Sequence, residues 1–226
     1  MKLMFLGTGA ADWQRKRPEG VLEYRRYSSA LIDGVLLIDP NDAVIEAMEE
    51  HGTDPRAVKY IVCTHRHRDH YSPETVEKLC GMGARFYELC DGDCTVMGEY
   101  TLRAYKGNHG TAEETVHFMI SKGDKSLYYA LDGAWLMYGE VAAIKEHCPA
   151  LLVLDATVGE AEGDYRIFEH NDLRMVLEMK SALSSYVERF AISHMARTLH
   201  ESHALLEDKM AKHGIITAYD GLVLEI

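Results

Sequence analysis

The stretch that most restricts the fold of this chain is residues 60–73, where an apolar, β-branched run breaks into a polar cluster. Residues 60–64 read YIVCT and residues 65–70 read HRHRDH, so four residues of metal-ligating type fall within six positions. Ser72 and Pro73 follow as a typical N-cap and first position of a helix. The pattern predicts a buried strand with a polar loop at its carboxyl end, which is where α/β proteins place their sites.

The spacing within this loop fits metal binding. Residues two apart in an extended segment point the same way, so His65 and His67 can reach one ion together. Asp69 and His70 follow as the chain turns, and they face either a second ion or the same one. Imidazole and carboxylate are ligands that borderline divalent metals prefer. A histidine-rich surface loop is the alternative, and the position directly after a buried strand favours the metal site.

Further apolar runs along the chain also end in a histidine or a carboxylate. These strand ends carry His109, Asp132, Asp155 and His194. Two β-rich halves with intervening helices predict an α/β (α+β) fold, in which two mixed sheets pack face to face with helices outside them as a four-layer αββα sandwich. We also expect a hairpin around Asp33-Gly34, a helix over residues 199–212, and a final hairpin formed by residues 215–218 and 222–226.

Length and composition limit the class of protein. The 226 residues suit a single domain, 1–226, and no linker divides them. No apolar run approaches the roughly 20 residues of a membrane span, and the first residues read as a strand rather than a signal peptide. Five cysteines without a paired framework favour a reduced, cytoplasmic protein.

The charge balance narrows the choice of partner. A formal net charge of −12 disfavours extended nucleic acid, whose binding depends on Lys and Arg neutralising phosphates. A small anionic substrate remains compatible, because bound divalent metals invert the local field. Residues 12–27 contain Arg15, Arg17, Arg25 and Arg26, for which a solvated surface loop and a substrate clamp both stay open. A homodimer is also left open.

The HRHRDH segment matches the H-x-H-x-D-H signature of the metallo-β-lactamase fold hydrolases, and the chain resembles that family over most of its length. The opening strand with Gly-Thr-Gly and the hairpin that ends in Ile-Asp-Pro add to the resemblance. The resemblance implies a two-metal centre. One metal would be held by His65, His67 and His109, the other by Asp69, His70 and His194, and Asp132 would bridge both. From its position, Asp39 could orient a ligand histidine through the other ring nitrogen.

Two details relate the chain to one branch of this family. With Asp132 at the bridging position, the chain is similar to phosphodiesterases, glyoxalase II-like thioesterases and lactonases, whereas classical β-lactamases lack that carboxylate. The opening FLGTGA and the His/Asp spacing look most like cyclic phosphodiesterases, including the phosphoribosyl 1,2-cyclic phosphate phosphodiesterases. In that branch a histidine about two dozen residues before the last ligand protonates the leaving oxygen, and His170 lies 24 residues before His194. The cysteine-bound structural zinc of the phosphonate enzyme has no counterpart, since the first cysteine is Cys63.

The resemblance therefore implies a metal-dependent hydrolase, most similar to a phosphodiesterase acting on a small cyclic phosphate or nucleotide-like substrate. A hydroxide bridging two divalent metals would attack phosphorus, Asp69 would orient it, and His170 would act as general acid. The ligands suit zinc or manganese, with iron and nickel as further options. A lactonase or thioesterase on the same centre is one alternative, and a non-catalytic or redox metal-binding module is another.

Overall fold

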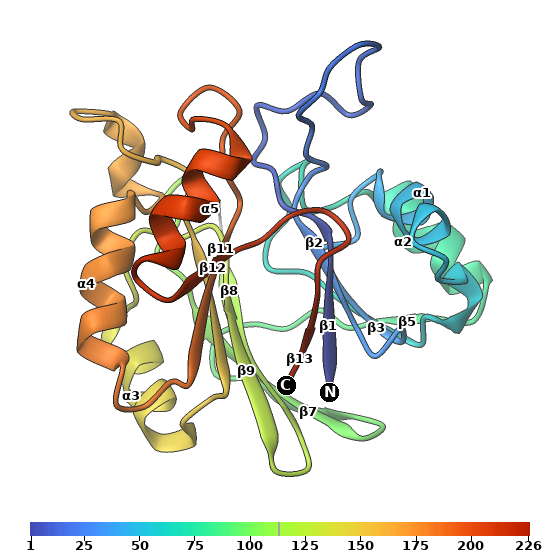
Figure 1. The fold of residues 1–226 in the computed structure, drawn as a ribbon. Coiled ribbons are helices and arrows are strands. Elements are labelled where there is room, and N and C mark those ends of the chain that lie inside the picture. Colours follow the sequence, from blue (N-terminus) through green and yellow to red (C-terminus); the bar gives the residue numbers. More distant parts are fainter. Residues whose placement is uncertain (113) are drawn as a thin grey trace.

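Two β-sheets packed face to face form the centre of the molecule, and helices cover their outer faces (Figure 1). The computed structural model describes residues 1–112 and 114–226. The first sheet has six strands in the order β13-β1-β2-β3-β4-β5, and the second has seven in the order β12-β11-β10-β9-β8-β7-β6. This arrangement confirms the predicted fold class, a four-layer αββα sandwich.

The first sheet contains most of the amino-terminal strands. Its members are β1 (Lys2–Gly7), β2 (Ser29–Ile32), β3 (Leu36–Ile38), β4 (Tyr60–Val62), β5 (Arg85–Phe86) and β13 (Val223–Glu225). The predicted hairpin around Asp33-Gly34 is present, since β2 and β3 pair antiparallel. Because β3 and β4 run parallel, the residues that follow them leave the sheet at the same edge. The outer face carries α1 (Val44–Glu50), η1 (Pro55–Ala57) and α2 (Pro73–Gly81).

The second sheet is mixed. Its members are β6 (Cys94–Met97), β7 (Tyr100–Lys106), β8 (Val116–Lys122), β9 (Lys125–Ala130), β10 (Leu151–Asp155), β11 (Arg189–Ser193) and β12 (Ile215–Thr217). The strands β9, β10, β11 and β12 are parallel, so their carboxyl ends meet at one edge. The helical elements after β9 are α3 (Tyr138–His147), η2 (Tyr165–Phe168), α4 (Leu173–Leu183) and α5 (His203–Ala211). Among the described residues, no helix is long and apolar enough to cross a membrane.

Strand β10 shows how the core is divided. Successive side chains of a strand point to opposite faces. Leu151 and Val153 accordingly pack in the core between the two sheets, together with Phe5 of β1. Leu152 and Leu154 face the other way and pack against the helices of the outer layer. Strand β10 is therefore buried on both faces, as the continuous hydrophobic run predicts.

The final hairpin predicted for residues 215–226 is wrong. Strand β12 pairs with β11 of the second sheet, whereas β13 pairs with β1 of the first. The chain crosses between the sheets at Asp220, whose carboxylate accepts hydrogen bonds from Thr8 Oγ1 at 2.8 Å and from the N–H of Arg26 at 2.7 Å. These two long-range contacts hold the turn open, so the strands on its two sides join different sheets.

The helix predicted over 199–212 begins later, at His203. Residues 197 and 198 are held in a turn because the carboxylate of Asp12 accepts hydrogen bonds from the N–H groups of Arg197 (2.8 Å) and Thr198 (3.1 Å). Ser202 is then the N-cap. The helix therefore starts at its own cap, Ser202, after a turn that a long-range contact with Asp12 holds in place.

Candidate metal centre

The predicted ligands lie where strands of both sheets end. The HRHRDH loop follows β4, His109 follows β7, Asp132 follows β9 and His194 follows β11. Asp155 is the last residue of the neighbouring strand β10. Because the parallel strands of each sheet release their carboxyl ends at one edge, residues more than a hundred positions apart meet there.

The structure brings His65, His67 and His109 together as one group, whose ligand atoms all lie within 4.8 Å of one another. His109 Nε2 is 3.2 Å from His67 Nδ1. His65 and His109 are buried, whereas His67 is half-buried on the side of the solvent. Three convergent imidazoles of this kind make a group able to bind one divalent ion.

A second group adjoins the first and consists of Asp69, His70, Asp132 and His194. All four residues are buried. Asp132 contacts both groups, since its Oδ2 is 3.4 Å from His65 Nε2 and its Oδ1 is 3.1 Å from His194 Nε2. Its Oδ2 also contacts His70 Nε2. The carboxylate thus lies between the two groups, at the position predicted for a bridging ligand.

The backbone of the site adopts unusual conformations. Asp39, Asp132 and His194 all have positive φ angles, of 61°, 56° and 61°. Non-glycine residues rarely occupy this region, and such conformations persist only where the surrounding structure over-determines them. Here the turn directs each side chain from the end of its strand toward the centre.

Hydrogen bonds behind the ligands orient two of the rings. His70 Nδ1 is 2.9 Å from Asp39 Oδ2, and His194 Nδ1 is 2.7 Å from Thr157 Oγ1. In both rings the Nε2 atom therefore faces the centre, where the two Nε2 atoms approach to 3.2 Å. The structure thus places Asp39 as the sequence suggested. Thr157 carries no such signal in the sequence, because its position depends on the turn after β10.

His170 also reaches the site. Its Nδ1 is 2.9 Å from Asp155 Oδ2 and 3.3 Å from Asp132 Oδ1, and its ring stacks on that of His194 with centroids 5.4 Å apart. Burial lowers the pKa of His170, but Asp155 outweighs it and holds the pKa above the ordinary value. Asp155, which the sequence marks only as a strand end with a ligand-type side chain, thus lies behind His170 and His194.

Charge is concentrated in this buried cluster. Burial and the neighbouring His70 lower the pKa of His65 to about 2, so that its ring is neutral. Burial acts against the charged form of His194, but Asp132 and hydrogen bonding to Asp155 raise its pKa to about 10. Burial raises the pKa of Asp69, yet His70 and His194 outweigh it and hold that carboxyl ionised. The cluster therefore contains carboxylates and imidazoles on which a bound cation could take the place of a proton.

Two atoms test whether the residues fit a metal. His65 Nε2 and Asp132 Oδ1 are buried and lie 3.1–3.4 Å from atoms of the neighbouring ligand side chains, yet neither makes a hydrogen bond among the described residues. Buried polar atoms are almost always hydrogen-bonded, so an exception needs an explanation. Lone pairs directed at a shared cation supply one, because both atoms belong to ligand groups of suitable chemistry.

A cavity of about 190 Å³ opens onto these groups. Its walls include the predicted residues His67, Asp69, His109, Asp132, His170 and His194. They also include residues that the sequence analysis did not select, namely Asp12, Thr111, Arg166 and Glu169. Glu169 directly precedes His170 and Arg166 lies four residues before it, so their proximity to that histidine in the sequence was the available signal.

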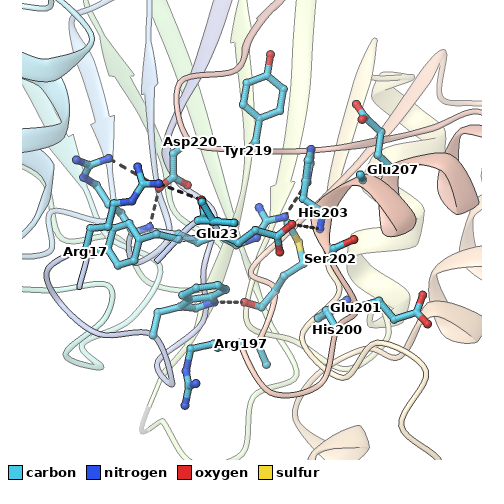
Figure 2. A pocket seen from close by; sticks show the side chains of 18 of the residues that line it. Arg17, Glu23, Arg197, His200, Glu201, Ser202, His203, Glu207, Tyr219 and Asp220 are labelled. Atoms are coloured by element: carbon cyan, nitrogen blue, oxygen red, sulfur yellow. Dashed lines mark hydrogen bonds and ion pairs between the residues drawn. The ribbon is translucent and has the colours of Figure 1, made fainter. Parts of the chain in front are cut away.

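Three of the four arginines of residues 12–27 line a different and larger cavity, of about 930 Å³ (Figure 2). Arg25 is buried there and donates a hydrogen bond of 2.6 Å to Thr8 Oγ1, and Arg17 donates to carbonyls of its own loop. Arg26 and Arg15 form ion pairs with carboxylates in or just before α1. None of the four lines the metal cavity, which argues against a substrate clamp there, and the burial of Arg25 departs from a solvated loop at that position.

No family model matches the chain, and no curated protein matches it. Solved structures do match it. The metallo-β-lactamase fold protein YhfI from Bacillus subtilis is 14% identical, with 100% of this chain and 99% of that chain covered and a TM-score of 0.75. Zn²⁺-bound PqqB from Methylobacterium extorquens is 15% identical, with both chains covered completely and a TM-score of 0.74. A diphosphatase from the PhnP family is 17% identical, with 100% of this chain and 97% of that chain covered and a TM-score of 0.71.

Proposed function

From its metallo-β-lactamase fold, we propose that this protein is a metal-dependent hydrolase that cleaves a phosphodiester of a small anionic substrate at a dinuclear centre. The observation that carries the proposal is the meeting of two ligand groups at one buried carboxylate, Asp132. A two-metal site with a bridging carboxylate suits the in-line displacement of a phosphoester. A protein that shares the fold is a diphosphatase from the PhnP family, which supports this choice.

The ligand assignment follows the two groups. One ion would be held by His65, His67 and His109, the other by Asp69, His70 and His194, with Asp132 between them. Zn²⁺ and Mn²⁺ suit these donors, and Zn²⁺ is the ion bound in PqqB. Bound there, the ions would supply Lewis acidity and lower the pKa of a water toward neutrality. The five free cysteines are consistent with a reduced, cytoplasmic location.

The residues of the chain then have separate tasks. Asp69 lines the cavity, and its Oδ2 lies 3.5 Å from both His70 Nε2 and His194 Nε2. From that position its carboxylate can accept a hydrogen bond from the attacking water and orient it. Burial lowers the pKa of His170, but Asp155 outweighs it and raises the pKa, which favours the protonated ring that a general acid needs. With Nδ1 bound to Asp155, the Nε2–H is left to protonate the leaving oxygen.

Metal content and hydrolysis, measured together, test the proposal. The protein is purified without chelator, its metal per chain is counted, and it is assayed on bis-para-nitrophenyl phosphate, a 2′,3′-cyclic nucleotide and a lactone panel. We expect two metals per chain and phosphodiester cleavage that is lost in Asp132→Ala but kept in Asp124→Ala, whose side chain is exposed in a turn. Cleavage of lactones without phosphodiesters would instead support a lactonase or thioesterase on the same centre.

The role of His170 has its own readout. General acids contribute typically 10²- to 10⁴-fold, and less when the leaving group is already a good one. His170→Ala should therefore reduce the hydrolysis rate much more for the cyclic nucleotide, whose leaving group is an alkoxide, than for the para-nitrophenyl ester. His213→Ala removes an exposed histidine and should change neither rate. An equal loss on both substrates in His170→Ala would exclude the general-acid assignment.

A further inference from the structure

The short helix η2 presents two different faces, one to the metal cavity and one to solvent. Side chains at i and i+3 of a 3₁₀-helix lie above one another. Arg166 and Glu169 form one such pair, and both line the metal cavity. Tyr165 and Phe168 form the adjacent pair, and their side chains are 77% and 76% exposed. His170 follows immediately in the chain.

The cavity side of η2 is firmly held. The Asp164 carboxylate accepts hydrogen bonds from Arg166 Nε at 2.8 Å and from its Nη2 at 2.6 Å. The carbonyl of Glu169 lies 3.3 Å from His109 Nδ1, and Glu169 Oε2 accepts a hydrogen bond from Thr111 Oγ1. The element is thus tied to a ligand of the proposed centre, and its aromatic face is left uncovered beside it.

A second loop adds further exposed aromatic side chains. Trp135, three residues after Asp132, has a φ of 59° and is 45% exposed. A bulky residue in this conformation is an outlier, and such strain clusters at ligand-binding sites. The N–H of Trp135 donates a hydrogen bond of 2.7 Å to Asn171 Oδ1, which joins this loop to the one that carries His170. Tyr138, the first residue of α3, follows that loop and is 88% exposed.

The size of the cavity indicates what this surface does. Pockets that enclose a whole drug-sized ligand measure roughly 300–1,000 Å³. At about 190 Å³, the metal cavity has room for a phosphate group but leaves the substituents of a nucleotide outside. Arg166 lines the cavity and its guanidinium carbon lies 6.0 Å from the Tyr165 ring centroid, so the aromatic face adjoins a residue of the cavity wall.

We propose that Tyr165 and Phe168, with Trp135 on the loop bonded to Asn171, form a stacking subsite for the leaving group, and that this leaving group is a nucleoside. The inference rests on the proposed function, because the general acid His170 defines the side from which the leaving group departs. Aromatic side chains stack on any base, since every base has a π-face. The subsite therefore recognises the presence of a base and does not select its identity.

Two ligands with the same phosphate test this directly by calorimetry on the metal-reconstituted protein. Adenosine 5′-monophosphate and ribose 5-phosphate differ in the base. Base–aromatic stacking corresponds to roughly 5- to 160-fold in affinity, so we expect adenosine 5′-monophosphate to bind tighter by a factor in that range. In the double variant Tyr165→Ala/Phe168→Ala the two affinities should converge, with ribose 5-phosphate unchanged. Tyr186→Ala removes a partly exposed aromatic ring after α4 and should keep the difference.

The outcomes separate this inference from the proposed function. Equal affinities of the two ligands in the wild type, or a difference that persists in the double variant, would overturn the stacking subsite. A dimer that dissociates in the double variant, with the affinity difference retained, would assign the aromatic face to a second copy of the chain and likewise overturn it. Hydrolysis of bis-para-nitrophenyl phosphate reports on the metal centre separately. Stacking without any phosphodiester cleavage would overturn the leaving-group role.

Discussion

His117 is a buried histidine outside the metal groups, and its removal is the sharpest test of how the centre is supported. The residue is 1% exposed on β8. Its Nδ1 is 2.5 Å from Glu140 Oε1, and its Nε2 is 3.0 Å from the carbonyl of Leu131, which precedes Asp132. His117→Ala therefore breaks a buried ion pair and releases the loop that carries the proposed bridging carboxylate.

The magnitude follows from what stays behind. Glu140, itself 1% exposed, would keep the N–H of Met137 at 2.7 Å and the hydroxyl of Tyr128 at 3.2 Å but would lose its cationic partner. Breaking a buried pair by removing one partner costs about 3–5 kcal/mol. For a chain of this length, 1 kcal/mol corresponds to about 2–4 °C in Tm. We expect Tm to fall by about 6–20 °C.

Thermal and urea unfolding, followed by circular dichroism in EDTA, provide the assay. Chelation separates this effect from any loss of bound metal. His213→Ala, at an exposed position, should stay within about 0.5 kcal/mol of the wild type. The double variant His117→Ala/Glu140→Gln removes both charges and should be less destabilised than the sum of its single variants. A loss below about 1 kcal/mol in His117→Ala, or strict additivity in the double variant, would refute the buried pair as a support of the site.

Three further predictions concern pH, backbone packing and metal. Burial lowers the pKa of His117, but Glu140 outweighs it and raises the pKa above 6.5. The free energy of unfolding of the wild type should therefore exceed that of His117→Gln by its full amount below about pH 6.5, and the difference should decline at higher pH. Urea titrations across pH measure this difference. Gly7→Ala would put a Cβ 1.9 Å from the carbonyl oxygen of Tyr27 and should destabilise by at least about 1–3 kcal/mol in thermal unfolding, whereas Gly81→Ala meets open space and should be neutral or slightly stabilising. Free Zn²⁺ at 100 times its Kd should raise the unfolding free energy by about 2.7 kcal/mol in the wild type, and Asp132→Ala at the same free Zn²⁺ should gain less; equal gains would argue against the assigned ligand.

The candidate ligands were predictable because each one is marked locally. An apolar run that ends in histidine or aspartate indicates a buried strand with a polar group at its carboxyl end, as at His109 and Asp132. Parallel pairing brings such ends to one edge, so the ends of β9, β10 and β11 had to lie close together. The structure adds the relation between the groups, in which Asp132 contacts His65 and His194 at once.

Other features of the site left no mark in the local pattern. Thr157 orients His194, and Asp155 holds His170, through contacts that depend on the turn after β10. Arg166 lines the cavity because η2 lies next to it, where the carbonyl of Glu169 contacts His109. The arginine-rich segment was open to two interpretations, a solvated surface loop and a substrate clamp, and the burial of Arg25 against Thr8 fits neither of them at that position.

The chain's sequence alone determined the layered fold class, the strand ends and the identity of the candidate ligands, because hydrophobic periodicity and ligand-type residues are properties of short segments. Only the tertiary structure decided that β12 and β13 join different sheets, that Asp155 stands behind His170, and that an aromatic face borders a cavity of about 190 Å³. These features depend on pairings between residues far apart in the chain. Such pairings are selected by the packing of the whole molecule, and no short segment contains the information that specifies them.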